Sequence, residues 1–145
     1  MEQSLVESVD VLHAALVAFQ PETYSAHDCA TLAEKLAALE KVSAAARVRS
    51  AARAGESGAH RERGFAEVSD WMARATGSTA GSAKAALDTA AALESQPEAK
   101  VALEAGELSF AQARELLRTE AVVRFGRGSK TRNSVEVQAQ ANPAQ

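Results

Sequence analysis

The chain has 145 residues, with 16 Lys and Arg against 19 Asp and Glu and a net charge of −3. This length supports one domain with its own apolar core, and the charge balance does not indicate nucleic-acid binding by the chain as a whole. Ala accounts for 34 residues, Ile is absent and aromatic residues make up 4%, which favours closely packed helices and disfavours β-sheet.

The single cysteine, Cys29, excludes an intramolecular disulfide and a zinc site built from several thiolates. We expect it to be a buried, reduced thiol. The N-terminus lacks the basic and apolar regions of a secretory signal, and no apolar run approaches the roughly 18 residues that a membrane helix needs. These features predict a cytoplasmic protein that does not interact with a membrane.

Residues 4–19 form the first predicted helix. Apolar residues recur along it in alternating steps of four and three, which places them on one face: Leu5, Val9, Leu12, Leu16 and Phe19. Pro21 follows and is expected to stop the helix, because the residue before a proline disfavours the helical conformation.

A second helix is predicted to begin between Ser25 and Asp28 and to end at Gly55 and Gly58. A helix of about 28 residues is long for a globular protein, which favours packing against a partner chain or a larger bundle. Its apolar stripe fades from leucine to small residues towards the end of the helix, where the last turns are expected to be exposed to solvent. The stripe consists of Cys29, Leu32, Leu36, Leu39, Ser43, Ala46 and Ser50.

Residues 55–64 are polar and rich in glycine, so they are predicted to form a loop in which His60 is exposed. Trp71 and Phe110 are expected to be core residues of the half that follows. This half is predicted to hold four short helices: 66–75 ending at Gly77, one from Ser78 or Thr79 to Leu93, one from Pro97 to Gly106, and one that begins at Ser109.

The predicted fold is all-α, with a long helical hairpin followed by a compact bundle of short helices that have helix-turn-helix-like turns. One helical domain is predicted over residues 1–125, with the hairpin at 4–54 and the short helices at 66–123. Residues 126–145 lack the apolar pattern and are predicted to be a disordered tail.

Charge is distributed unevenly along the chain. Residues 1–46 carry a net charge of −5 and residues 47–84 carry +3. Residues 85–110 carry −4, and residues 111–145 carry +3. The segment 47–84 is therefore the first basic region, and clustered Lys and Arg are what phosphate contact requires.

The order and spacing of short motifs in the second half are similar to those of a known family. The motifs are Asp70-Trp71-Met72-Ala73-Arg74-Ala75-Thr76-Gly77-Ser78, then Ala83-Lys84-Ala85-Ala86-Leu87, and then Ala102-Leu103-Glu104-Ala105-Gly106-Glu107-Leu108-Ser109. Over residues 28–118 the chain resembles the domain-of-unknown-function 222 family of actinobacterial proteins, also called the 13E12 repeat family.

In that family the domain usually precedes an HNH endonuclease, so the resemblance implies an association with DNA. An HNH site needs a histidine base, an asparagine and metal-binding His or Asp residues on a ββα unit. The histidines of this chain are His13, His27 and His60, all before residue 61. We therefore expect a truncated or free-standing relative that lacks the nuclease.

The sequence contains no nucleophile motif, no Gly-rich phosphate loop and no pair of carboxylates on one face, so neither enzymatic activity nor a cofactor is predicted. His13, His27 and Cys29 are irregularly spaced and a fourth ligand is unsupported, so no metal site is predicted.

The candidate DNA contacts lie in the basic segment, because Lys and Arg neutralise phosphates and hydroxyls can donate to them. They are Arg47, Arg49, Arg53, Arg61, Arg63, Thr79, Ser82 and Lys84. Cations at a helix C-terminus also complement the helix dipole without any ligand. Residues 69–86 fit a helix-turn-helix, but helix packing explains the same pattern, and the second helix offers no bidentate base reader.

The sequence thus predicts a non-catalytic, DNA-associated helical domain that contacts the phosphates of double-stranded DNA with little base specificity. The alternative is a helical protein-interaction module that self-associates through the helix at 26–54. A third hypothesis is a decayed remnant of a longer nuclease, without independent activity.

Overall fold

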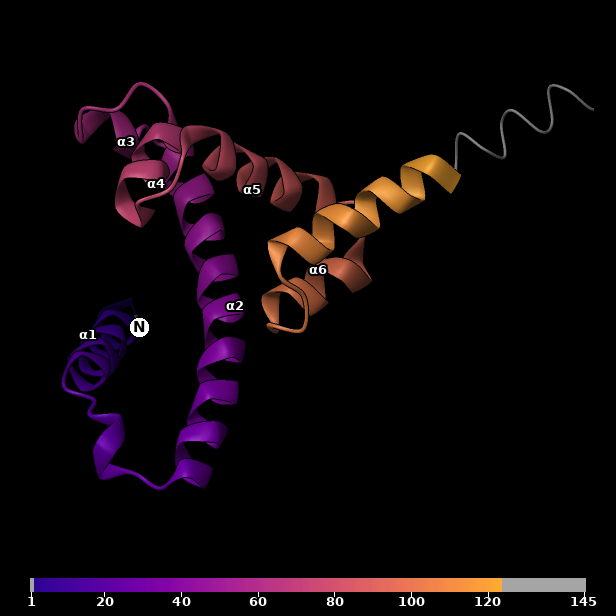
Figure 1. Ribbon diagram of the computed structural model, residues 1–145. Coiled ribbons are helices and arrows are strands. Elements are labelled where there is room, and N and C mark those ends of the chain that lie inside the picture. The colour runs from indigo at the N-terminus through magenta and orange to yellow at the C-terminus, as the bar shows by residue number, and fades with distance from the viewer. Residues whose placement is uncertain (1, 124–145) are drawn as a thin grey trace, which may run out of the picture. The chain divides into compact units, whose positions relative to one another are not determined.

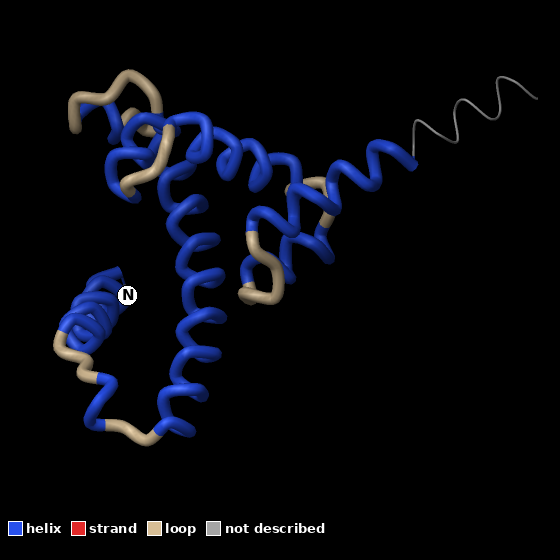
Figure 2. The backbone as a smooth tube through the Cα atoms, viewed as in Figure 1, coloured by secondary structure: helices blue, strands red, loops and turns tan. Residues whose placement is uncertain are grey.

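The computed structural model describes residues 2–123, with side chains from residue 4, and all regular structure in this range is helical (Figure 1, Figure 2). The elements are α1 (Glu2–Val17), the 3-10 helix η1 (Pro21–Thr23), α2 (Ala26–Glu56), α3 (Ala59–Glu62), α4 (Val68–Thr76), α5 (Ala80–Leu93), α6 (Pro97–Glu104) and a further helix over residues 110–123. The predicted all-α fold class is confirmed. The predicted tail, 126–145, lies outside the described residues.

The chain divides within α2 into two compact units, Met1–Ala37 and Ala38–Gln145. We call them the N-terminal unit and the C-terminal unit. Every buried side chain in the described part of the chain belongs to the C-terminal unit. None of the helices described is both long and apolar enough to span a bilayer.

Short-range contacts fix the turn between α1 and α2 in the N-terminal unit. The Asp28 N–H donates to the Ser25 hydroxyl (3.1 Å), so Ser25 caps α2 within the predicted range. The rings of Phe19 and Tyr24 pack with their centroids 5.4 Å apart. The prediction that Cys29 is buried is wrong: its thiol is half-buried, because the turn that it contacts is itself exposed.

Four helices meet in the core of the C-terminal unit. One cluster of buried side chains takes one residue from each of them: Ala45 in α2, Leu93 in α5, Leu103 in α6 and Ala113 in the helix 110–123. Two of the four are alanines, so the helix backbones can approach closely. Phe110 packs against this cluster, whereas Trp71 is half-buried.

The buried face of α2 follows the predicted stripe only as far as Leu39. The stripe positions that hold small residues are exposed: Ser43, Ala46 and Ser50. The expectation that the last turns of the helix are exposed is wrong, because another face of these turns is buried. The positions that turn inward are three residues apart: Val42, Ala45, Val48 and Ala51. Each step of three turns the face by about 60°. The buried face of α2 rotates because the helix has two successive partners. Val42 packs against the loop at Gly106, and further along α2 Gly55 packs against Val68 of α4.

The segment predicted as a polar loop is partly helical. α2 runs through Gly55 and ends at Glu56, and a Cβ on Gly55 would lie only 2.6 Å from Val68 Cγ2. The turn α3 follows and places His60 inside, with 6% of the residue exposed. The expectation that His60 is exposed is therefore wrong. Its Nδ1 atom is buried without a hydrogen-bond partner among the described residues.

The predicted boundaries of the short helices are confirmed by their caps. Gly77 has a φ of +68° and ends α4, because glycine adopts the left-handed conformation without a steric penalty. The Ser82 N–H donates to the Thr79 hydroxyl (3.1 Å) at the start of α5. Pro97 opens α6 at its first turn, where a backbone N–H is not needed.

Replacing Ser109 by alanine is expected to lower the free energy of unfolding by about 1 kcal/mol. Ser109 begins the helix 110–123 with a reciprocal capping box: its hydroxyl accepts from the Gln112 N–H (3.2 Å), and its own N–H donates to Gln112 Oε1 (2.9 Å). Denaturant unfolding followed by circular dichroism measures the loss. Ser50→Ala is the control, because Ser50 lies on an exposed face inside α2 and should not destabilise the helix. Equal losses in the two variants would contradict the capping role.

Candidate nucleic-acid interface

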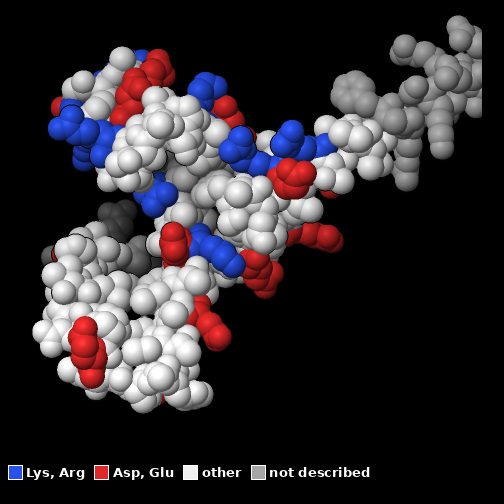
Figure 3. Space-filling model, viewed as in Figure 1, with Lys and Arg blue, Asp and Glu red and all other residues white. Residues whose placement is uncertain are grey.

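All eight residues predicted to contact DNA are exposed and belong to the C-terminal unit. Arg47, Arg49 and Arg53 lie on the last turns of α2, and Arg61 and Arg63 lie in and just after α3. Thr79, Ser82 and Lys84 lie in the first turns of α5. Figure 3 shows that the Lys and Arg side chains of this unit alternate with Asp and Glu, so the face drawn is not an unbroken basic surface.

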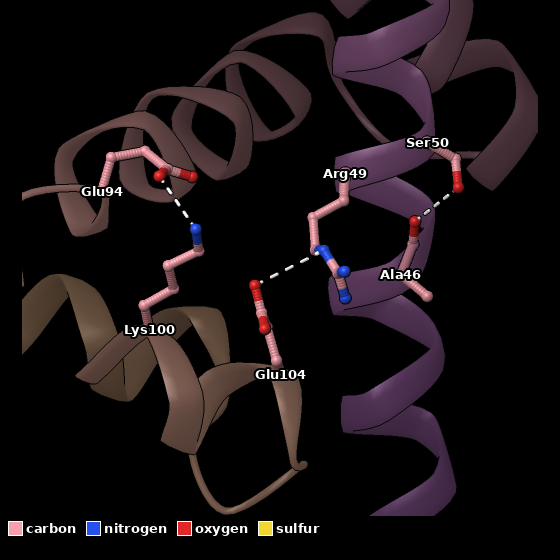
Figure 4. Close-up of polar contacts among 6 residues, drawn as sticks. All are labelled: Ala46, Arg49, Ser50, Glu94, Lys100 and Glu104. Carbon is pink, nitrogen blue, oxygen red and sulfur yellow. Dashed lines mark hydrogen bonds and ion pairs between the residues drawn. The ribbon is translucent and has the colours of Figure 1, made fainter. Parts of the chain in front are cut away.

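Three of these cations form ion pairs with carboxylates of the same unit. Arg49 Nε lies 3.5 Å from Glu104 Oε1 of α6, as Figure 4 shows. The other two pairs join neighbours on one helix: Arg53 with Glu56 at 2.5 Å and Lys84 with Asp88 at 3.0 Å. Exposed ion pairs of this kind contribute only about 0–1 kcal/mol, so a phosphate can replace the carboxylate at little cost.

A fourth ion pair, drawn near Arg49–Glu104 in Figure 4, does not involve the candidate residues. Lys100 Nζ donates to Glu94 Oε2 at 2.9 Å. This hydrogen bond and the Glu94 charge raise the pKa of Lys100 above its ordinary value. The pair ties the end of α5 to α6.

Arg63 is positioned by an aromatic ring. Its guanidinium carbon lies 5.3 Å from the centre of the Trp71 ring, within the range of a cation–π contact. Its Nη1 also donates to the Ala59 carbonyl oxygen (2.9 Å). These contacts hold the guanidinium against α3 and α4. The Trp71 ring that it covers is half-buried rather than part of the buried core.

A small cleft of about 150 Å³ lies where α2 meets α4 and α5. Its lining combines one guanidinium, three hydroxyls and an apolar floor: Arg47, Val48, Met72, Thr76, Ser78, Ser82, Ala83, Ala86 and Leu87. We call it the Arg47 cleft. Arg47 is exposed and forms no ion pair within the described residues. The cleft therefore presents an unpaired positive charge beside three hydroxyls, of which that of Ser82 donates no hydrogen bond within the described residues.

The turn between α4 and α5 supplies the hydroxyls of this cleft. Thr76 Oγ1 and Ser78 Oγ share a hydrogen bond of 2.7 Å across Gly77, and Thr76 also donates to the Met72 carbonyl. The α5 N-terminus follows, capped by Thr79. Sequence reasoning missed Thr76 and Ser78, although two hydroxyl residues on either side of a turn glycine are a visible signal.

A larger open hollow of about 700 Å³ lies between α6 and the helix 110–123. It is lined by Gln96, Pro97, Glu98, Ala99, Ala102, Leu108, Leu116 and Glu120. Its two ionisable residues are carboxylates, and Gln96 Nε2 already donates to Glu120 Oε2 (2.7 Å). This hollow is therefore unsuited to phosphate.

Within residues 2–123, no group of three or more His, Cys, Asp or Glu residues is arranged to hold a metal ion. Comparisons with protein-family models, with curated proteins and with solved structures gave no match. The resemblance to the domain-of-unknown-function 222 family therefore stays a prediction. The chemistry of the Arg47 cleft is the basis on which a function can be argued.

Proposed function

We propose that the C-terminal unit binds the sugar-phosphate backbone of double-stranded DNA, with little base specificity. The observation that supports this proposal best is the Arg47 cleft, where an unpaired guanidinium from α2 lies with three hydroxyls at the α4–α5 turn. A guanidinium donates two parallel hydrogen bonds to a phosphate, and the Ser82 hydroxyl, which donates no other hydrogen bond within the described residues, adds a further donor.

The α5 N-terminus adds to this arrangement. α5 has 14 residues, and its aligned peptide dipoles give its N-terminus a partial positive charge. Its first turn begins at the edge of the cleft, where this charge favours an anion. Ser82 lines the cleft from this turn, and Lys84 lies two residues further along the helix. Thr79, Ser82 and Lys84 can reach phosphates, but none of them reads a base in a bidentate manner. Binding through this surface is therefore insensitive to sequence.

The remaining arginines extend the contact. Arg61 is exposed and unpaired within the described residues, and Arg63 is held in place by Trp71. Arg53 can exchange its exposed partner Glu56 for a phosphate at small cost, and Arg49 is itself exposed although its partner Glu104 is half-buried. The proposal therefore uses all eight residues of the candidate set, with Arg47 as the central contact.

Binding of a fluorescently labelled random duplex is expected to weaken steeply as salt rises. Six phosphate contacts, one for each Lys or Arg of the candidate set, would lower the affinity roughly 1,800-fold between about 50 and about 200 mM monovalent salt. Fluorescence anisotropy measures this dependence directly. An affinity that does not change over this range, or no binding at the lowest salt, would overturn the proposal.

Arg47→Ala is expected to reduce the slope of log affinity against log salt by about one, and to weaken binding to different duplexes equally. Arg118→Ala is the charge-matched control: Arg118 is also exposed, but it lies on the helix 110–123 and pairs with Glu115 at 3.6 Å. The control should retain the wild-type slope. Equal effects of the two substitutions would show that net charge, and not the Arg47 cleft, determines binding.

A further inference from the structure

The ion pair between Arg49 and Glu104 belongs to a longer row of alternating charges. Glu94, Lys100, Glu104 and Arg49 lead from the end of α5, across α6, to α2, as Figure 4 shows. Lys100 Nζ lies 2.9 Å from Glu94 Oε2, and Glu104 Oε1 lies 3.5 Å from Arg49 Nε. Lys100 and Glu104 are one helical turn apart on α6, so they are neighbours on its surface. Glu104 therefore has a cation on either side.

The Glu104 carboxylate depends on a neighbouring cation. Its side chain is only 29% exposed, and it is the last residue of α6, where the helix dipole disfavours a negative charge. A carboxylate that is partly withdrawn from water is costly unless a cation compensates it. Arg49 differs, because its side chain is 58% exposed and water solvates it when the pair opens. The pair therefore opens at small cost only where a second cation stays beside Glu104.

Lys100 is this second cation. The hydrogen bond to Glu94 and the Glu94 charge raise the pKa of Lys100 most, and the Glu104 charge raises it further. Lys100 and Glu104 thus attract each other along α6, in addition to the contact between Glu104 and Arg49. When Arg49 turns to another anion, Glu104 keeps its interaction with Lys100, and no carboxylate is left uncompensated.

We propose that Glu104 competes with phosphate for Arg49, and that Lys100 is a positioning residue that allows Glu104 to release Arg49. This inference rests on the proposed function and specifies how one of its contacts is regulated. In the absence of nucleic acid, Glu104 neutralises Arg49. A phosphate of the duplex displaces Glu104 and pairs with Arg49, while Lys100 holds the Glu104 carboxylate. Lys100 thus supports binding without contacting the duplex.

Glu104→Gln is expected to raise the affinity for a labelled random duplex at low salt, because it removes the competing carboxylate. The rise should exceed that in the control Glu107→Gln by about two- to fivefold, the range of an exposed ion pair. Glu107→Gln removes the same charge from an exposed residue that forms no ion pair within the described residues. Fluorescence anisotropy of the full chain measures the affinities, and circular dichroism checks that the variants are folded.

Lys100→Met is expected to lower the affinity, because Glu104 then depends on Arg49 alone and holds it more tightly. In the Glu104→Gln background the same substitution should have no larger effect than Arg118→Ala, which also removes one cation. Lys100→Arg should restore wild-type binding, because it keeps the charge. A purely structural role of Lys100 at the junction of α5 and α6 would instead lower the affinity equally in both backgrounds.

The outcomes separate this inference from the proposed function. Salt-dependent binding with equal effects of Glu104→Gln and Glu107→Gln would overturn the inference and leave the proposed function standing. Equal effects of Lys100→Met in both backgrounds would overturn the role of Lys100. Binding by Glu104→Gln where the wild type binds weakly would support the competition directly. Absence of binding by every variant at the lowest salt would overturn both proposals.

Discussion

Replacing Gly106 by alanine is expected to lower the free energy of unfolding by about 2 to 5 kcal/mol. Two features of the position contribute. Gly106 has a φ of +78°, a conformation that costs other residues about 1–2 kcal/mol. A Cβ atom here would also lie 2.5 Å from Val42 Cγ2 and 3.0 Å from the Ala38 carbonyl oxygen. Crowding in a packed core typically costs a further 1–3 kcal/mol, as an order-of-magnitude estimate.

Gly77→Ala is the control that separates these two costs. Gly77 has a similar φ of +68°, but a Cβ on it would meet no atom within 4 Å. Its substitution should cost only the conformational part, about 1–2 kcal/mol. Urea unfolding followed by circular dichroism gives both values. If the two variants lost the same stability, the close approach of the Gly106 turn to α2 would have no energetic effect.

The Gly106 contact also bears on the candidate interface. Glu104 pairs with Arg49 of α2, and Gly106 lies only two residues further along the chain. A displaced turn would therefore move the Glu104 carboxylate away from Arg49. Because Arg49 is exposed and the two groups are 3.5 Å apart, loss of the pair should change stability less than the crowding does and should leave Arg49 free for phosphate. Gly106→Ala is thus expected to destabilise the fold without weakening DNA binding at temperatures where the variant stays folded.

The helix boundaries could be predicted from the sequence because local chemistry determines them. Gly77 ends α4 through its own backbone freedom, and Thr79 and Ser109 cap the next helices with their own side chains. Pro97 opens α6 by its fixed geometry. None of these signals depends on residues distant in the chain.

The buried face of α2 could not be predicted in the same way, because different partners determine it along its length. Val42 turns inward to meet Gly106, which lies 64 positions later. The helix ends at Glu56, between Gly55 and Gly58 as predicted, but the close approach of Val68 to Gly55 could not be read from α2 alone. His60 is flanked by polar residues in the sequence, yet α3 places it in the protein interior. Periodicity on one segment does not contain this information.

The candidate site could be predicted only in part, because its contacts also depend on residues that are distant in the chain. Basic residues are visible in the sequence, so Arg47 and Arg61 could be named, but their ion-pairing state depends on the fold. Arg49 meets a carboxylate 55 positions away, whereas Arg47 meets none within the described residues. The hydroxyls of Thr76 and Ser78 join Arg47 only because α4 and α5 pack against α2.

Leu93→Ala is expected to lower the free energy of unfolding by about 2 to 5 kcal/mol. Leu93 is only 1% exposed and is the largest fully buried side chain in the described core. Its removal leaves a cavity between α5 and the neighbouring helices, because backbones held together by Ala45 and Ala113 cannot move closer to fill it. Urea unfolding followed by circular dichroism measures the change.

Leu116→Ala is the matched control for this substitution, since it removes the same atoms from a residue that is 45% exposed. It should cost about 1 kcal/mol or less, because much of its surface is already in water. A similar loss in both variants would mean that the core at Leu93 relaxes to fill its cavity. A large loss at Leu93 alone would show that the alanine-rich core, where α2, α5, α6 and the helix 110–123 meet, is rigid and does not close over the cavity.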